Sequence, residues 1–223
     1  AIWHGPDGQN WLLATAKEGN SIIAYDANDG SFIERFGDGG SGEGQFERPN
    51  GIAVIDDLVL VVERDNQRVQ VFRLPEFKSL GYFGSEGLED GLILPYGIAI
   101  DRTGENTYEL YVTDNYNPNK EGYPAEGELD KRVHHFRFTV NGNSIESEQL
   151  NIFGEVYNEG ALHKVESLWT DREHNRLLIA EEWYADRSIK VYDLEGNYTG
   201  KKIPKKYFDS EPEGIALYKC MAA

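Results

Sequence analysis

Two groups of polar residues stand at comparable points of repeated segments in this sequence, and together they could do chemistry. The first group is three glutamates: Glu166 in "VESL", Glu182 in "AEEW" and Glu213 in "PEGI". The second group is Lys17, Arg64 and Tyr96. Several carboxylates can hold a hard cation such as calcium, whereas cationic and phenolic groups can neutralise and hydrogen-bond an anion. A cation beside an anion pocket predicts phosphate chemistry, in which a metal clamps oxygens and activates water.

The elements that would position these residues repeat along the chain. Similar segments begin at five points: "AIWHGPD" at Ala1, "GIAVIDD" at Gly51, "GIAIDRT" at Gly97, "SLWTDRE" at Ser167 and "GIALYKC" at Gly214. The intervals are close to 47 residues, except for a longer one of 70 residues between Gly97 and Ser167. A repeat of this length is typical of a four-stranded propeller blade.

Each repeat contains four short runs rich in Val, Ile, Leu, Tyr and Phe, separated by turn sequences such as "ANDG" and "LEGN". Such runs favour antiparallel strands, and their radial repetition predicts an all-β fold, a β-propeller. We expect one incomplete propeller domain over 1–223, with four blades and the first strand of a fifth. The expected boundaries are 1–50, 51–96, 97–166, 167–213 and 214–223.

In a meandering blade, the first strand lines the central channel of the propeller. Because successive strands run in opposite directions, the start of the first strand and the end of the second lie at the same mouth of this channel. The residues that precede the first strands are Asn50, Tyr96, Glu166 and Glu213, and those that close the second strands are Lys17, Arg64, Asp114 and Glu182. These eight positions are therefore expected to surround one opening. The alternative is that they are solvated loop ends with casual ion pairs.

Composition narrows the classes of partner. The formal net charge of −17 argues against binding nucleic acid through bulk electrostatics, because the phosphate backbone would be repelled. No apolar run approaches the roughly 20 residues of a membrane span. A single cysteine excludes an internal disulfide framework and a cysteine-rich zinc site.

Several motifs resemble one known family. "LLATAKEGNSIIAYD", "KVESLWTD", "LLIAEEW" and "EPEGIALYK" are similar, in order and in blade offset, to segments of the calcium-dependent β-propeller phytases. The resemblance implies six blades in the full-length protein, calcium held by Glu166, Glu182 and Glu213, and phosphate held by Lys17, Arg64 and Tyr96. Lys17 and Arg64 would also be catalytic, because they balance charge on the transferred phosphoryl group.

The resemblance further implies a phosphatase of the 3-phytase type that cleaves phytate (inositol hexakisphosphate) with a calcium-activated water. It also implies a secreted or periplasmic protein that is monomeric when the propeller is complete. The chain departs from the family pattern because it lacks the acidic triplet before "AIW" and the final blade. A further family lysine has no clear counterpart, and only Lys120, in an insertion over 115–130, could replace it.

A second resemblance supports a different function. "GQFERPNGIAVIDDLVLVVERDNQRVQVF" (44–72) is similar to an NHL repeat, which occurs in propellers that serve as binding scaffolds. The alternative function is therefore a non-catalytic propeller with structural calcium. Because a fold does not determine a function, the site residues must decide between the two.

Overall fold

The computed structural model describes residues 1–116, 124–125 and 127–218 of the chain. Within these residues, sixteen strands form four four-stranded antiparallel sheets. The first sheet contains β1 (Ile2–His4), β2 (Asn10–Ala16), β3 (Ser21–Asp26) and β4 (Phe32–Phe36). The second contains β7 (Pro49–Ile55), β8 (Leu58–Glu63), β9 (Arg68–Arg73) and β10 (Lys78–Phe83).

The third sheet contains β11 (Pro95–Gly104), β12 (Thr107–Asp114), β13 (Val133–Asn141) and β14 (Ser144–Phe153). The fourth contains β15 (Val165–Asp171), β16 (Arg176–Glu181), β17 (Ser188–Tyr192) and β18 (Tyr198–Ile203). A short parallel pair, β5 (Asp38–Gly39) and β6 (Gln45–Phe46), joins the first two sheets along the chain. The helices among the described residues are single 3₁₀ turns: η1 (Pro6–Gly8), η2 (Lys17–Gly19), η3 (Asn158–Gly160), η4 (Arg172–His174) and η5 (Lys205–Tyr207).

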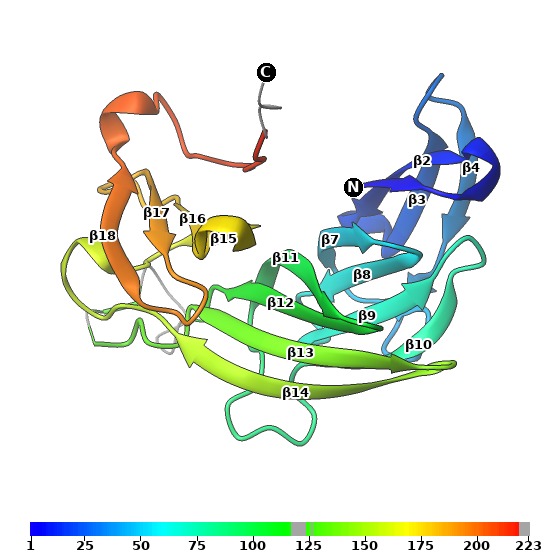
Figure 1. Cartoon of the computed structure of the whole chain (residues 1–223), viewed down its shortest axis with the longest axis horizontal. Coiled ribbons are helices and arrows are strands. Elements are labelled where there is room, and N and C mark those ends of the chain that lie inside the picture. The colour runs from blue at the N-terminus through cyan, green and yellow to red at the C-terminus, as the bar shows by residue number, and fades with distance from the viewer. Residues whose placement is uncertain (117–123, 126, 219–223) are drawn as a thin grey trace.

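The strands of each sheet follow one another in chain order, so each sheet is a meander. Figure 1 shows the four sheets side by side around an arc, with the first sheet at one end and the fourth at the other. This is the arrangement of propeller blades, and the predicted all-β propeller fold is confirmed.

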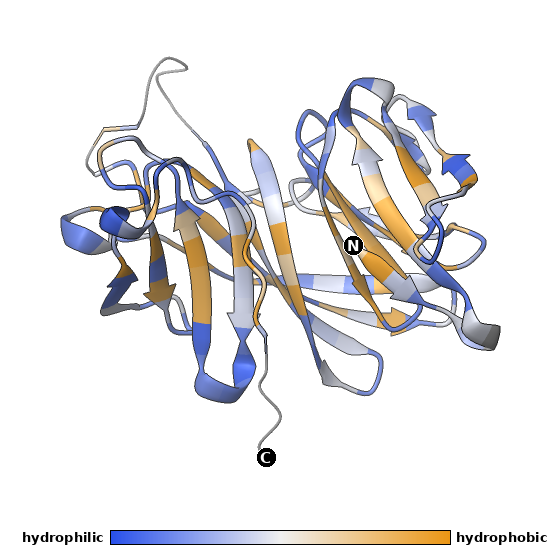
Figure 2. Cartoon of the chain, turned by 90° about the horizontal axis from the view of Figure 1, so that it is seen from above, coloured by the Kyte–Doolittle hydropathy of each residue, from blue (hydrophilic) through white to orange (hydrophobic). Residues whose placement is uncertain are grey.

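Both faces of the central sheets are buried, because each sheet packs against a neighbour on either side. The run "LVLVV" of β8 illustrates this, since successive side chains of a strand point to opposite faces. Leu58, Leu60 and Val62 pack between the second and third sheets, whereas Val59 and Val61 pack between the first and second. Figure 2 shows the apolar residues along the strands and the hydrophilic ones mostly at the turns.

Aromatic residues fill the three interfaces between neighbouring sheets. Trp3, Phe46 and Phe72 lie between the first and second sheets. Phe83, Phe136 and Phe138 lie between the second and third, and Tyr111, Phe153 and Tyr192 between the third and fourth. These interfaces fix the angle between blades and therefore the positions of the strand ends at the mouth.

The chain after the fourth sheet is irregular where it is described. Residues 214–218, expected to begin a further strand, form no ladder with any described residue, and 219–223 lie outside the described residues. Gly214 nevertheless lies beside β15, because its N–H is 3.4 Å from Ser167 Oγ. Lys120 and half of the predicted insertion also lie outside the described residues.

Candidate functional site at the mouth of the propeller

A buried carboxylate ends the second strand in three of the four sheets. These residues are Glu63, Asp114 and Glu181, and none of the three is exposed to solvent. Each accepts one or two backbone N–H groups from the segment that leads into the inner strand of the same sheet. Asp114 accepts from Ile93 at 2.7 Å and from Leu94 at 2.9 Å. The carboxylates thereby fix the segment that precedes each inner strand against the end of the second strand.

The residue after this carboxylate is the one that reaches the mouth. In the strand ladders, Glu63 pairs with Pro49, Asp114 with Pro95 and Glu181 with Val165, so these three positions are equivalent. The mouth positions that follow are Lys17, Arg64, Asn115 and Glu182. The prediction that Asp114 lies in this ring is therefore wrong by one residue. Asp114 is an internal anchor, and the mouth position in the third sheet belongs to Asn115, whose Oδ1 accepts a hydrogen bond from the Val165 N–H at 2.9 Å.

Close contacts between neighbouring inner strands set the positions of Tyr96 and Glu166. A Cβ atom added to Gly97 would lie 1.9 Å from the Glu166 carbonyl oxygen, so only glycine allows this approach. Thr113 Oγ1 donates a hydrogen bond of 2.9 Å to the same oxygen and accepts one of 2.8 Å from the Gly97 N–H. An analogous bond joins Thr15 Oγ1 to the Asn50 carbonyl oxygen at 2.8 Å.

One hollow at the mouth brings together three of the six predicted site residues. It has a volume of about 300 Å³, and its wall includes Lys17, Asn50, Tyr96 and Glu166. Lys17 Nζ lies 5.2 Å from the centre of the Tyr96 ring, within the range of a cation–π contact. The Asn50 side-chain N–H₂ group is inaccessible to solvent and has no hydrogen-bond partner among the described residues. This wall therefore offers an ammonium group and an unused amide donor.

Tyr96 lies between the cationic and the acidic parts of the site. Burial, together with the charge and hydrogen bonding of Glu166, raises the pKa of Tyr96 to about 12. The phenol is therefore protonated at every physiological pH and acts as a hydrogen-bond donor. It connects the Lys17 side of the hollow with the carboxylates.

The carboxylates converge on Lys164, a residue that the sequence analysis did not single out. Lys164 Nζ lies 2.8 Å from Glu182 Oε2, 3.4 Å from Glu211 Oε2 and 3.5 Å from Glu166 Oε1. Burial opposes the charge on Lys164, but the hydrogen bond to Glu182 and the surrounding carboxylates raise its pKa above the usual value. Three carboxylates therefore share one ammonium group.

Glu182 is the most enclosed member of this cluster, with a side chain only 1% exposed. Burial raises the pKa of Glu182 to about 7, against the hydrogen bond from Lys164, which lowers it. The charges of Glu166 and Glu211 add to the increase, because one ammonium group cannot neutralise three carboxylates. Glu182 Oε1 is inaccessible and has no hydrogen-bond partner among the described residues.

Two predicted residues lie outside these contacts. Arg64 Nε is 3.7 Å from Asp65 Oδ1, and Arg64 is not part of the wall of the hollow. Glu213 is exposed, and its backbone oxygen lies 3.4 Å from Ser167 Oγ. In the described part of the chain, the carboxylate that joins the cluster from this segment is Glu211. Both glutamates of "EPE" were visible in the sequence, but only Glu213 shared the repeat offset.

The carboxylates around Lys164 can be compared with the coordination that calcium requires. Three carboxylates around one point, one of them with an unpartnered buried oxygen, fit a hard divalent cation in charge and in ligand chemistry. Their distances from Lys164 Nζ exceed the roughly 2.3–2.6 Å of calcium–oxygen bonds. Among the described residues, no three acidic, histidine or cysteine side chains are already spaced to hold a metal ion. The carboxylates thus have the chemistry of calcium ligands, but their present spacing suits an ammonium group and is wider than calcium coordination requires.

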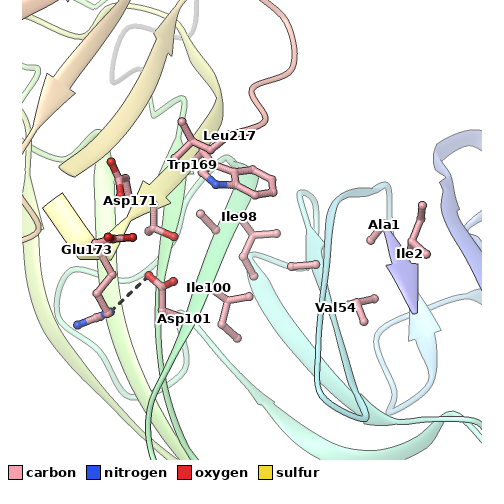
Figure 3. Close-up of a pocket in the computed structure, with 14 residues that line it drawn as sticks. Ala1, Ile2, Val54, Ile98, Ile100, Asp101, Trp169, Asp171, Glu173 and Leu217 are labelled. Atoms are coloured by element: carbon pink, nitrogen blue, oxygen red, sulfur yellow. Dashed lines mark ion pairs between the residues drawn. The ribbon is translucent and has the colours of Figure 1, made fainter. Parts of the chain in front are cut away.

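A larger hollow, of about 630 Å³, follows the inner strands away from this mouth. Figure 3 shows its wall, with Ile98, Ile100 and Trp169 on one side and Ala1 and Ile2 across the opening. Its polar end includes an ion pair of 3.5 Å between Arg172 Nε and Asp101 Oδ2. None of the six predicted site residues contributes to its wall, so the size of the hollow does not identify the site.

Comparisons with known proteins agree with the class of fold. The family model of the NHL repeat matches residues 46–72, which include β7 and β8 and most of β9. A search of curated proteins found no matching sequence. Among the described residues, no helix is both long and apolar enough to cross a membrane.

Solved structures with low sequence identity share the fold. A chain of the nidogen/laminin complex is 15% identical with a TM-score of 0.52, over 87% of this chain and 60% of its own length. Hydrazine synthase of Kuenenia stuttgartiensis is 15% identical with a TM-score of 0.54, over 91% of this chain and 48% of its own. A Bacteroides caccae protein of unknown function is 15% identical with a TM-score of 0.53, over 95% of this chain and 69% of its own. The protein is a β-propeller, and it spans about half to two thirds of the length of these similar structures.

Proposed function

We propose that the mouth site binds a phosphate ester beside a divalent cation and that the protein is a calcium-dependent phosphomonoester hydrolase that acts on phytate. The observation that carries this proposal is the single hollow at which Lys17, Asn50 and Tyr96 meet Glu166. Donors for an anion and one carboxylate of the acidic cluster line the same hollow. That combination suits a phosphate group, which needs both.

The residues on the donor side have distinct roles in this proposal. The Lys17 ammonium group and the unpartnered Asn50 amide bind phosphate oxygens. The Tyr96 hydroxyl stays protonated and hydrogen-bonds to Glu166; when Glu166 holds the cation, the same O–H is available to orient a phosphate oxygen. Arg64 occupies the equivalent mouth position in the second sheet and supplies a second cationic group for a substrate with several phosphates.

The acidic residues hold the cation in this proposal. Glu166, Glu182 and Glu211 supply carboxylate oxygens, and Glu213 remains a predicted further ligand. A bound divalent cation would supply positive charge to the phosphate oxygens and would activate water for attack on phosphorus. Both the protein and phytate are strongly anionic and repel each other, so a bound cation is needed to offset this repulsion.

A second candidate is a non-catalytic binding propeller. The match to the NHL repeat supports it, and so does Lys164, which already partly neutralises the carboxylates without a metal. In that case the mouth would bind an anionic ligand without converting it. The two functions differ in turnover and not in fold.

Release of inorganic phosphate from phytate tests the proposal. The protein should release phosphate with added calcium and lose this activity in a calcium chelator. Glu182→Gln should reduce the rate and Lys17→Ala should raise KM, whereas Lys201→Ala, at an exposed position of β18, should change neither. Binding of calcium and phosphate with no phosphate release at any calcium concentration would instead support the binding propeller.

A further inference from the structure

The position of Lys164 has a consequence for cation binding that goes beyond the proposed activity. Its ammonium nitrogen lies within 3.5 Å of oxygens from all three clustered carboxylates, Glu166, Glu182 and Glu211. These carboxylates come from the start of β15, the residue after β16 and the segment that follows the fourth sheet. Lys164 therefore occupies the point at which the three segments meet.

The ammonium group does not satisfy this cluster fully. Glu182 Oε1 is buried without a hydrogen-bond partner among the described residues, although Oε2 of the same carboxylate bonds to Lys164 at 2.8 Å. A buried carboxylate oxygen without a partner is costly, so this atom points to a further ligand. Calcium carries twice the charge of an ammonium group and accepts six to eight oxygen ligands.

We propose that Lys164 is a built-in counter-ion that competes with a divalent cation for Glu166, Glu182 and Glu211. This inference rests on the cation half of the proposed function. Without a divalent cation, Lys164 keeps the three carboxylates together and limits their mutual repulsion. A cation that binds there must displace the ammonium group, so Lys164 lowers the affinity of the site and restricts binding to conditions of high calcium.

The local backbone supports such an exchange. The N–H groups of Lys164 and His163 are held by Glu181, at 3.0 Å and 2.6 Å, so the main chain stays fixed when the side chain moves. The Lys164 side chain is 29% exposed and therefore has a route to solvent. Its four-carbon stem allows the ammonium group to leave the cluster without a change of fold.

Calorimetric titration with calcium chloride tests this competition in the wild-type protein and in Lys164→Met. The variant removes the ammonium group and keeps a side chain of similar length. It should bind calcium at least about tenfold more tightly, and adding Glu182→Gln to it should remove most of this gain. The matched control is Lys202→Met, because Lys202 also lies near two carboxylates, Asp186 at 3.4 Å and Glu159 at 3.8 Å. This control should leave calcium affinity within about twofold.

The outcomes separate this inference from the proposed function. If wild-type protein binds calcium, Glu182→Gln weakens binding and Lys164→Met has no effect, the competition is refuted and the calcium site stands. Tight binding by Lys164→Met supports the competition even when phytate is not cleaved. No binding by either protein at millimolar calcium refutes both. If Lys164→Met is less stable without calcium, its melting temperature should rise more on calcium addition than that of the wild type, and an equal rise would also refute the competition.

Discussion

Glu181 and Glu182 are consecutive in the chain, but their carboxylates serve opposite purposes. Glu181 is fully buried and accepts the backbone N–H groups of His163, Lys164 and Trp183 at 2.6, 3.0 and 2.9 Å. Glu182 bonds instead to the Lys164 side chain at the mouth. The first carboxylate fixes the loop that carries the site, and the second belongs to the site itself.

This relationship predicts that two matched substitutions affect different properties of the protein. Glu181→Gln places an amide N–H₂ group against backbone donors and should lower the free energy of unfolding by about 3 kcal/mol. Glu182→Gln should leave the unfolding free energy nearly unchanged and should weaken calcium binding. Urea unfolding and calcium titration of both variants measure the two effects. Equal loss of stability in the two variants would show that this division of roles is wrong.

The anion side of the mouth gives a second prediction. Lys17→Ala removes the ammonium group in the hollow and should weaken binding of inorganic phosphate about tenfold, because a charge-assisted hydrogen bond is lost. Arg64→Ala should have a smaller effect on inorganic phosphate and a larger one on phytate, since Arg64 is not part of the wall of the hollow.

Lys201→Ala is the control for this experiment, because it removes the same charge from an exposed strand position. Titration with phosphate and with phytate should show no change for Lys201→Ala. If Lys17→Ala binds phosphate as the wild type does, the anion half of the site is refuted.

The contact between neighbouring inner strands leads to a third prediction. Gly97→Ala would bring a methyl group to 1.9 Å from the Glu166 oxygen, so the third and fourth sheets must move apart. We expect a loss of about 1 to 3 kcal/mol in unfolding free energy, together with weaker calcium binding, because Glu166 shifts. Gly104→Ala is the control, since its added Cβ meets only ordinary contacts from 3.4 Å outward. The two substitutions should differ clearly in melting temperature, and similar melting curves would contradict the inferred packing.

The buried histidine of the third sheet predicts a pH dependence of stability. Burial lowers the pKa of His134 from 6.5 to about 4; the charge of Asp90 opposes this shift, and the charge of Lys131 adds to it. His134 Nδ1 lies 3.0 Å from Gln149 Nε2, and its Nε2 lies 3.7 Å from Asp114 Oδ2. The folded protein therefore favours the neutral ring, and between pH about 6.5 and about 4 the unfolded chain binds more protons.

The contribution of His134 is thus fully present above pH 6.5 and is lost as the pH falls toward 4, by up to about 3 kcal/mol. Unfolding free energies measured across this range should fall less steeply in His134→Phe than in the wild type. His4→Ala, at an exposed position, should keep the wild-type slope. A parallel slope in His134→Phe would show that another group causes the effect.

The repeat and the alternation of apolar residues were enough to predict the blades. "LVLVV" reads as a strand buried on both faces, and "GIA" at Gly51 and Gly97 marks two inner strands whose glycines approach a neighbour. Those offsets also placed Lys17, Tyr96 and Glu166 at one mouth, as the structure has them.

Register and side-chain convergence were harder to predict. Asp114 was predicted at the mouth position that Asn115 occupies, because an acidic residue at a strand end resembles a mouth residue unless its burial is known. Lys164 and Glu211 were missed since neither shares the repeat offset, and each reaches the cluster by the length of its side chain. Such contacts depend on three-dimensional packing and leave no period in the sequence.

The most direct test of the account is the position of calcium in a crystal structure of the protein grown with calcium and phosphate. Anomalous scattering from calcium should appear among Glu166, Glu182 and Glu211, with the Lys164 ammonium group displaced and phosphate beside Lys17 and Tyr96. At a saturating calcium concentration, a structure in which Lys164 still bonds to all three carboxylates and calcium binds elsewhere would contradict the account.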